Sequence, residues 1–188
     1  TNYMIQQKDD SKTTYQFDEK QLMQTTGKKM YAPVNGGFGL AVTYRNVSLD
    51  LAFSYSLGKW LINEDKYYTL NQSSFGGKNF SKDLLNYWKQ EGDDTELPKL
   101  NSAYYMRKDT RLLENASYMR LKSVSISYAL PQELIDQMKF FSGVRLYASA
   151  RNIFTITKYS GADPEFSNTL SRGYPPTRQY TFGVELKF

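Results

Sequence analysis

The sequence predicts an all-β fold, namely a segment of an antiparallel transmembrane β-barrel, and three observations lead to that prediction. Several segments alternate strictly between apolar and polar side chains, which gives a β-strand one apolar and one polar face. These segments reach the roughly ten residues that cross a bilayer when tilted, whereas strands of soluble proteins are about half as long. Aromatic residues make up 15% of the chain, and barrels place such residues in girdles at both membrane interfaces.

The segment 178–188 shows this alternation most clearly and ends on an aromatic residue. A terminal strand that ends in Phe is a familiar feature of outer-membrane barrels, whereas the termini of soluble proteins usually fray in water. We therefore predict that its apolar residues form the barrel-assembly signal of the carboxyl-terminal strand. These residues are Tyr180, Phe182, Val184, Leu186 and Phe188. Taken alone, the segment is also compatible with the edge strand of a soluble β-sandwich.

Two strands are expected at 38–46 and 47–58, joined by a tight turn at Arg45 and Asn46. Their apolar residues would form two rows on one face of a β-hairpin. The rows are Phe38, Leu40, Val42 and Tyr44 on the first strand, and Val47, Leu49, Leu51, Phe53, Tyr55 and Leu57 on the second.

Two further strands are expected at 117–130 and 143–157. In the first of them, Met119 and Leu121 are out of phase with the apolar residues of the second half. A β-bulge near Lys122 would restore the phase, as would a strand that projects beyond the membrane, where the facing rule relaxes. The apolar row of the other strand is Val144, Leu146, Ala148, Ala150, Phe154 and Ile156.

Charged side chains stand among Ser, Thr and Gly in the polar rows of these strands. Asp50, Arg145, Arg151 and Glu185 are expected to face the barrel lumen. They could line a transport path, but we favour ion pairs with neighbouring strands or with a plug inside the barrel.

The connections between the strands have two lengths. Long loops are expected at 59–116 and 158–177, whereas the connections at 45–46 and 131–141 are short, the latter helix-like. Barrels carry long loops outside the cell and short turns in the periplasm. Strand directions assigned backward from a periplasmic Phe188 place both long loops outside without conflict.

A short helix is expected within the first long loop, at 81–91. Ser81 would cap it, Leu84 and Trp88 would share one face, and Gly92 would end it.

Several classes of function are excluded by composition. The chain has no Cys and no His, so it lacks a disulfide framework, the usual general base of serine hydrolases and the commonest metal ligands. Nothing in the sequence assembles a nucleophile, a base and an orienting group, so we expect neither an enzyme nor a cofactor or metal site. The net charge of +5 is scattered without a basic stripe, which speaks against nucleic-acid binding.

The number of strands is too small for a complete barrel. Five strands, with a sixth at 2–7, do not close a bacterial barrel, which has at least about eight. An open sheet would leave unpaired edges in lipid. We therefore expect the chain to be the carboxyl-terminal piece of a longer protein.

The run 115–131 reads NASYMRLKSVSISYALP, and five further stretches matter with it, at 35–46, 87–98, 144–155, 158–165 and 174–183. Taken in order, these six stretches resemble the end of the SusC/RagA family of TonB-linked outer-membrane transporters. The run 115–131 is similar to the family strand "sYlRlknitLsYtlP". Arg151 stands where the family often has Gln or Glu before the Asn of its "gqNlf" run.

This resemblance implies a plugged barrel of about 22 strands, in the outer membrane of a gram-negative bacterium. The plug and the TonB box that contacts the TonB complex would lie in an amino-terminal region absent from this chain. A SusD-like surface lipoprotein would cover the barrel. The implied function is import of oligosaccharides, or in some cases peptides, that are too large for porins.

Two other functions remain open from the sequence. One is a soluble β-sandwich that binds glycans through its long loop, although Phe53, Tyr55, Phe154 and Phe182 argue against exposure of those rows to water. The other is a barrel that does not transport, such as an adhesin or an outer-membrane hydrolase.

Aromatic residues of the first long loop are the candidates for contact with substrate or with the lipoprotein lid. Tyr87, Trp88, Tyr104 and Tyr105 could stack on sugar rings, or they could pack the small core of the loop itself. In the second loop, Asp163 and Glu165 around Pro164 could bind a cation, but a turn is the expected role, because Gly161 and Pro164 set the backbone geometry.

Overall fold

The computed structural model describes residues 2–6, 23–72, 77, 79–100, 108–165 and 174–188. The chain divides into two compact units. The sheet unit comprises Val34–Leu57, Tyr118–Thr157 and Tyr174–Phe188, and the loop unit comprises Thr1–Pro33, Gly58–Ser117 and Lys158–Gly173.

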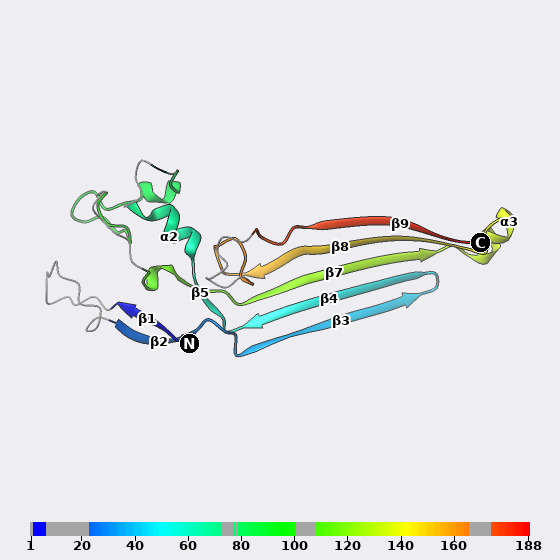
Figure 1. Ribbon diagram of the computed structural model, residues 1–188, viewed down its shortest axis with the longest axis horizontal. Coiled ribbons are helices and arrows are strands. Elements are labelled where there is room, and N and C mark those ends of the chain that lie inside the picture. Colours follow the sequence, from blue (N-terminus) through cyan, green and yellow to red (C-terminus); the bar gives the residue numbers. More distant parts are fainter. Residues whose placement is uncertain (1, 7–22, 73–76, 78, 101–107, 166–173) are drawn as a thin grey trace. The chain divides into compact units, whose positions relative to one another are not determined.

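The sheet unit is one antiparallel sheet of five strands in the order β3-β4-β7-β8-β9 (Figure 1). Among the described residues β3 and β9 each pair on one side only, so the sheet is open, as a segment of a barrel must be. The expected all-β, antiparallel fold is thereby confirmed. The strands are β3 (Val34–Tyr44), β4 (Val47–Leu57), β7 (Tyr118–Ala129), β8 (Gly143–Thr157) and β9 (Gln179–Lys187).

The register places apolar residues of all five strands on one face, which we call the apolar face. Residues directly opposite each other in antiparallel strands point to the same side of the sheet. The central row of this face is Leu40, Leu51, Val124, Ala150 and Tyr180. The next row is Val42, Leu49, Ile126, Ala148 and Phe182. The opposite side, the polar face, carries the row Ala41, Asp50, Ser125, Ser149 and Thr181.

The bulge expected near Lys122 is confirmed. Ala52 lies opposite Ser123 and Phe53 lies opposite Leu121, so Lys122 is an extra residue in β7. This extra residue returns Leu121 to the apolar face. Strand β8 also bulges here, at Asn152, whose φ of 54° is a conformation that Asn tolerates.

Compact connections join the strands at the end of the sheet that carries the carboxyl terminus (Figure 1). The β3–β4 turn uses Arg45 at a φ of 52°, and the backbone N–H of Ala129 donates to the Asn46 carbonyl at 2.9 Å. Helix α3 (Gln132–Met138) lies between β7 and β8, as expected for a helix-like connection, and Lys139 ends it in the left-handed conformation.

The loop unit contains short elements around a small core. Its two-stranded sheets are β1 (Asn2–Gln6) with β2 (Met23–Lys29), and β5 (Trp60–Ile62) with β6 (Leu113–Asn115). The helices among its described residues are α2 (Glu64–Leu70) and the 3-10 helices η2 (Lys82–Leu85) and η3 (Thr110–Leu112). The core residues are Tyr67, Leu70, Leu84 and Leu112. The strand expected at 2–7 therefore exists over its described part, but it pairs with β2 and not with the five-stranded sheet.

The helix expected at 81–91 is wrong in length. Ser81 does cap a helix, because its Oγ accepts the Asp83 backbone N–H at 3.2 Å, but only the short η2 follows. The chain then turns away, since the backbone N–H of Trp88 donates to the Leu97 carbonyl at 2.9 Å instead of continuing the helix. Gly92 lies in a later turn, at a φ of 94°.

Candidate functional site

The apolar face of the sheet unit extends across all five strands. Leu40 on β3 is 53% exposed and Phe182 on β9 is 80% exposed, although an aqueous surface rarely leaves such rows uncovered. An 11-residue strand such as β4 is about 36 Å long at roughly 3.3 Å per residue, and a tilt of about 40° reduces its span to about 28 Å. That span matches the hydrocarbon core of a bilayer, which is about 30 Å thick.

The four residues expected to face a lumen all lie on the polar face. Arg145 and Glu185 are direct partners on β8 and β9, and their Nη1 and Oε2 atoms are 3.6 Å apart. Asp50 lies between Ala41 and Ser125, and Arg151 lies opposite Gln179. The structure thus brings Arg145 and Glu185 together as an ion pair, and it leaves Asp50 and Arg151 at separate positions. Whether the polar face lines a lumen stays a prediction.

Four of the five residues predicted to be the barrel-assembly signal lie on the apolar face, and Phe188 follows the end of β9. Tyr180, Phe182, Val184 and Leu186 lie opposite Ala150, Ala148, Leu146 and Val144 in turn. Phe188 contacts the rings of Phe140 and Phe141, with ring centroids 5.5 and 5.4 Å away. Their role in assembly stays a prediction.

Arg120 is a buried residue of the polar face that the alternation alone did not single out. It is 2% exposed, its Nε donates to Thr155 Oγ1 at 2.8 Å, and its guanidinium lies 5.4 Å from the Tyr118 ring. A buried guanidinium needs such partners, because burying an unpaired charge is costly. The signal was available once the Lys122 bulge is included, because the bulge puts Arg120 opposite Ser54 and Thr155 on the polar face.

The aromatic candidates of the loop unit are only partly described. Tyr87 forms a β-bridge with Leu97, and Lys89 Nζ lies 5.2 Å from the Tyr87 ring. Trp88 is 38% exposed. Tyr104 and Tyr105 lie outside the described residues, so the four rings are not placed together in one binding surface. Their contact with a substrate or lid stays a prediction.

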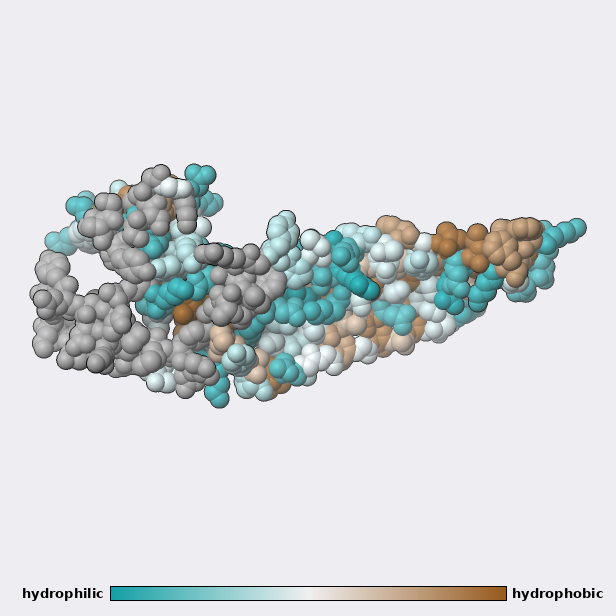
Figure 2. Space-filling model, in the orientation of Figure 1, coloured by the Kyte–Doolittle hydropathy of each residue, from teal (hydrophilic) through white to brown (hydrophobic). Residues whose placement is uncertain are grey.

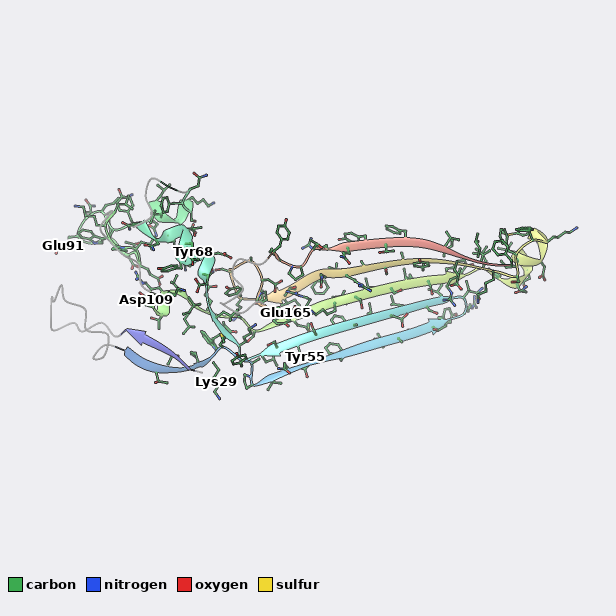
Figure 3. The ribbon with its side chains drawn as sticks, in the orientation of Figure 1. Lys29, Tyr55, Tyr68, Glu91, Asp109 and Glu165 are labelled. Atoms are coloured by element: carbon green, nitrogen blue, oxygen red, sulfur yellow. The ribbon has the colours of Figure 1, made fainter. Side chains whose placement is uncertain are left out.

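Three side chains hold the segment 160–165 onto the rest of the loop unit. The Glu114 carboxylate accepts the backbone N–H and the hydroxyl of Ser160, each at 2.8 Å. Asp65 Oδ2 accepts the Ala162 backbone N–H at 3.3 Å. Lys59 Nζ donates to the carbonyl of Pro164 at 2.7 Å and to that of Glu165 at 3.0 Å (Glu165 is labelled in Figure 3).

The pKa of Lys59 is shifted by this position. Burial lowers the pKa of its ammonium below 10.5, and the nearby carboxylates of Glu165 and Asp163 partly oppose that shift. Asp163 Oδ1 accepts the Glu165 backbone N–H at 2.8 Å, so the residues around Pro164 form a turn closed by a side chain. The expected turn is therefore present, and the described residues contain no cluster of His, Cys, Asp or Glu suited to a metal ion.

The sequence analysis missed helix α2 of the loop unit, as it missed the short elements β2, β5, β6 and η3. The Asn63 side chain accepts the Lys66 backbone N–H at 2.9 Å, and Glu64 and Asp65 occupy the first turn. A cap followed by two acidic residues is the usual sequence signal of a helix start. None of the helices among the described residues is long and apolar enough to span a membrane.

Comparison with known proteins shows clear relatives, although no family model matches the chain. TonB-dependent receptor P3 of Formosa agariphila is 34% identical over 165 residues, covering 81% of this chain and 16% of that receptor. TonB-dependent receptor SusC of Bacteroides thetaiotaomicron is 31% identical over 77 residues, 40% of this chain and 8% of that protein. The chain therefore spans less than a fifth of the length of these curated relatives.

Solved structures show the same likeness in three dimensions. The RagAB peptide importer in its "open-open" state matches with a TM-score of 0.76 at 37% identity, over 100% of this chain and 20% of the matched chain. In its "closed-closed" state the TM-score is 0.78 at 38% identity, over 97% of this chain and 20% of the matched chain.

Proposed function

This chain belongs to the SusC/RagA-type TonB-dependent receptors, and we propose from that premise that it forms strands of an outer-membrane barrel that imports large nutrients. One observation carries the proposal above the others. Apolar residues from all five strands share rows on one face, and the opposite face carries charged and hydroxyl side chains. Transmembrane barrels require this division, because one face meets lipid and the other an aqueous interior.

Each face then has a defined task in the wall of the barrel. The apolar face meets the hydrocarbon chains of the outer membrane. The polar face lines the lumen, where the ion pair between Arg145 and Glu185 links β8 to β9. The free edges of β3 and β9 pair with other strands of the receptor, because unpaired backbone groups are not tolerated in lipid.

The partners follow from the family. We propose that the TonB complex acts through an amino-terminal region, and that a SusD-like lipoprotein covers the extracellular loops. Transport needs no chemistry from this chain, which fits with relatives that are named receptors and importers and not enzymes. No cofactor is required.

The substrate is an oligomeric nutrient, either a peptide or an oligosaccharide. The likeness to the RagAB peptide importer extends over the whole chain at 37% identity, whereas that to SusC covers 77 residues at 31%. Oligopeptides are therefore the first substrate class to test. Selection between peptides and oligosaccharides would depend on the loops and the plug that contact the substrate.

Purification of the receptor from outer membranes tests the proposal. The polypeptide that contains these residues should have a mass several times 21.8 kDa and should copurify with a lipoprotein. Deletion of its gene should abolish growth on oligopeptides, or on an oligosaccharide, as the limiting nutrient. A folded, detergent-free species of 21.8 kDa would overturn the barrel, and unchanged growth on every oligomer would favour the adhesin alternative.

A further inference from the structure

The connection between β7 and β8 carries apolar side chains that the sheet unit does not cover. Helix α3 buries Ile135, which is 1% exposed, against the rest of the unit. Leu134 and Met138 are one helical turn apart, on the same side of α3, and each is 46% exposed. The polar residues Glu133 and Asp136 occupy the other side of the helix. Helix α3 is thus amphipathic, with an apolar side facing outward.

Three aromatic rings gather next to α3 in the chain and at the end of β9. The ring centroids of Phe140 and Phe141 are 5.2 Å apart, and both rings contact Phe188. Phe140 remains 70% exposed and Phe188 78% exposed within the cluster. The cluster is held in place, because Ser142 donates its backbone N–H to the Lys187 carbonyl at 2.7 Å and its hydroxyl to the Phe188 carbonyl oxygen at 3.1 Å.

The cluster adjoins the end of β9, where Val184 and Leu186 lie on the apolar face. Phe188 is two residues beyond Leu186, and continued alternation past the end of β9 would place it on the same face. Figure 2 shows apolar residues gathered at this end of the sheet, beside α3. The apolar face of β9 therefore ends next to the cluster.

We propose that α3 and the Phe140–Phe141–Phe188 cluster form an anchor seated in the headgroup–acyl boundary of the periplasmic leaflet, with phospholipid as its occupant. The inference rests on the proposed function, because the adjoining apolar face must itself meet lipid. A helix with one apolar and one polar side lies in such a boundary, and aromatic rings are favoured there. The anchor fixes the height of the barrel in the membrane at its periplasmic end.

Spin labels on the full-length receptor in phospholipid vesicles test the anchor. These 188 residues contain no Cys, so single substitutions introduce unique labels into this segment. The variants are Phe140→Cys and Leu134→Cys as reporters of the anchor, Glu133→Cys as the matched control on the polar side of α3, and Leu40→Cys on the apolar face. The readout is the accessibility of each label to oxygen, which partitions into lipid, relative to a water-soluble nickel complex.

The anchor predicts an oxygen-to-nickel ratio several-fold higher at positions 140 and 134 than at 133, and a similarly high ratio at position 40. A high ratio at position 40 with aqueous labels at 140 and 134 would overturn the anchor and leave the barrel intact. Labels at 140 and 134 shielded from both reagents would also overturn it, since a protein partner would then cover the cluster. An aqueous label at position 40 would overturn the proposed barrel together with the anchor.

Discussion

The sheet unit and the loop unit are stabilised in opposite ways. In the sheet unit, the side chains of the apolar face point outward, and hydrogen bonds between long strands hold the backbone. In the loop unit, apolar side chains such as Leu112, which is 0% exposed, point inward to a small core. In the proposed barrel the first arrangement depends on surrounding lipid, whereas the second is the ordinary arrangement of a protein in water.

The two units therefore place the same type of residue, an apolar side chain, in opposite positions. An apolar side chain is exposed to its surroundings in one and hidden from them in the other. Substitutions in the intact receptor can therefore distinguish the two units.

The largest effect is expected from Leu112→Ala in the loop unit. Removing a fully buried Leu side chain costs about 2–5 kcal/mol. Amides of α2 should lose hydrogen-exchange protection, while those of β4 and β8 keep theirs. Leu85→Ala is the matched control, since Leu85 is 71% exposed and should change stability by less than about 0.5 kcal/mol. Equal loss of protection in both units would contradict the division.

A charge on the apolar face should be nearly as damaging. Leu51→Arg places a guanidinium in the central row, which costs about 2–4 kcal/mol at the middle of a bilayer. Urea unfolding of the receptor in lipid vesicles measures this free energy. The matched control is Ser125→Arg, which lies opposite Asp50 on the polar face and should be tolerated. Equal losses for the two variants would mean that both faces meet the same solvent.

The hydrogen bonds of the Glu114 carboxylate to Ser160, which clamp the segment 160–165 in place, should contribute less. Glu114→Gln keeps the shape of the side chain but removes the charge that accepts the two Ser160 hydrogen bonds, at a cost of about 1.5 kcal/mol. Faster protease cleavage within 158–165 on whole cells is the expected result. Glu91→Gln, at an exposed position, should leave the cleavage rate unchanged, and a similar acceleration there would rule out a specific clamp.

A smaller loss of stability is expected where the Tyr147 ring lies close to Gly183 in the sheet. The Tyr147 ring covers Gly183, and a Cβ at Gly183 would lie 2.3 Å from Tyr147 Cζ. Gly183→Ala should cost about 1 kcal/mol, at the low end for overpacking, because the end of the ring can move. At Gly143 a Cβ would be no closer than 3.4 Å to Lys187, so Gly143→Ala should unfold in urea like the parent receptor. A neutral Gly183→Ala would mean that the ring has no structural role.

The smallest effect concerns the pH dependence of the turn at 89–93. Backbone N–H groups of Lys89 and Gln90 donate to Asp93 and lower its pKa below 3.8. The stabilisation of this turn is therefore complete above pH 3.8 and is lost as the pH falls through the lowered pKa. Hydrogen exchange of the Lys89 and Gln90 amides should accelerate in that acid range, beyond the change of an unstructured peptide. Asp93→Asn should remove this extra pH dependence, and its persistence would place the titrating group elsewhere.

Much of the sheet unit could be predicted from the sequence, because the facing of a strand is a local property. Successive residues on β3 and β4 point to opposite faces of the sheet. Apolar residues therefore recur on one face and polar residues on the other, and this alternation can be read directly from the sequence. The same logic located the bulge, since Met119 and Leu121 are out of phase without an extra residue at Lys122. The bulge in β8 escaped prediction, because Asn152 leaves the alternation of that strand unchanged.

The loop unit was less predictable because its contacts are distant in sequence. Leu70 packs with Leu84 and Leu112 in one core, and no local pattern joins them. The helix expected at 81–91 ended early for the same reason, since the backbone of Trp88 pairs with Leu97. The ion pair between Arg145 and Glu185 was also beyond prediction in detail, because it depends on the register of β8 against β9.

The bulge at Lys122 has a consequence for how this gene tolerates single-codon deletions. Because Lys122 is the extra residue, its loss would leave Leu121 opposite Phe53 and Ser123 opposite Ala52, with each on its present face. Loss of Ser127, in the regularly paired part of β7, would instead invert the facing of the residues on one side of the gap. Among single-codon deletions within β7, the one at Lys122 should therefore be among the best tolerated.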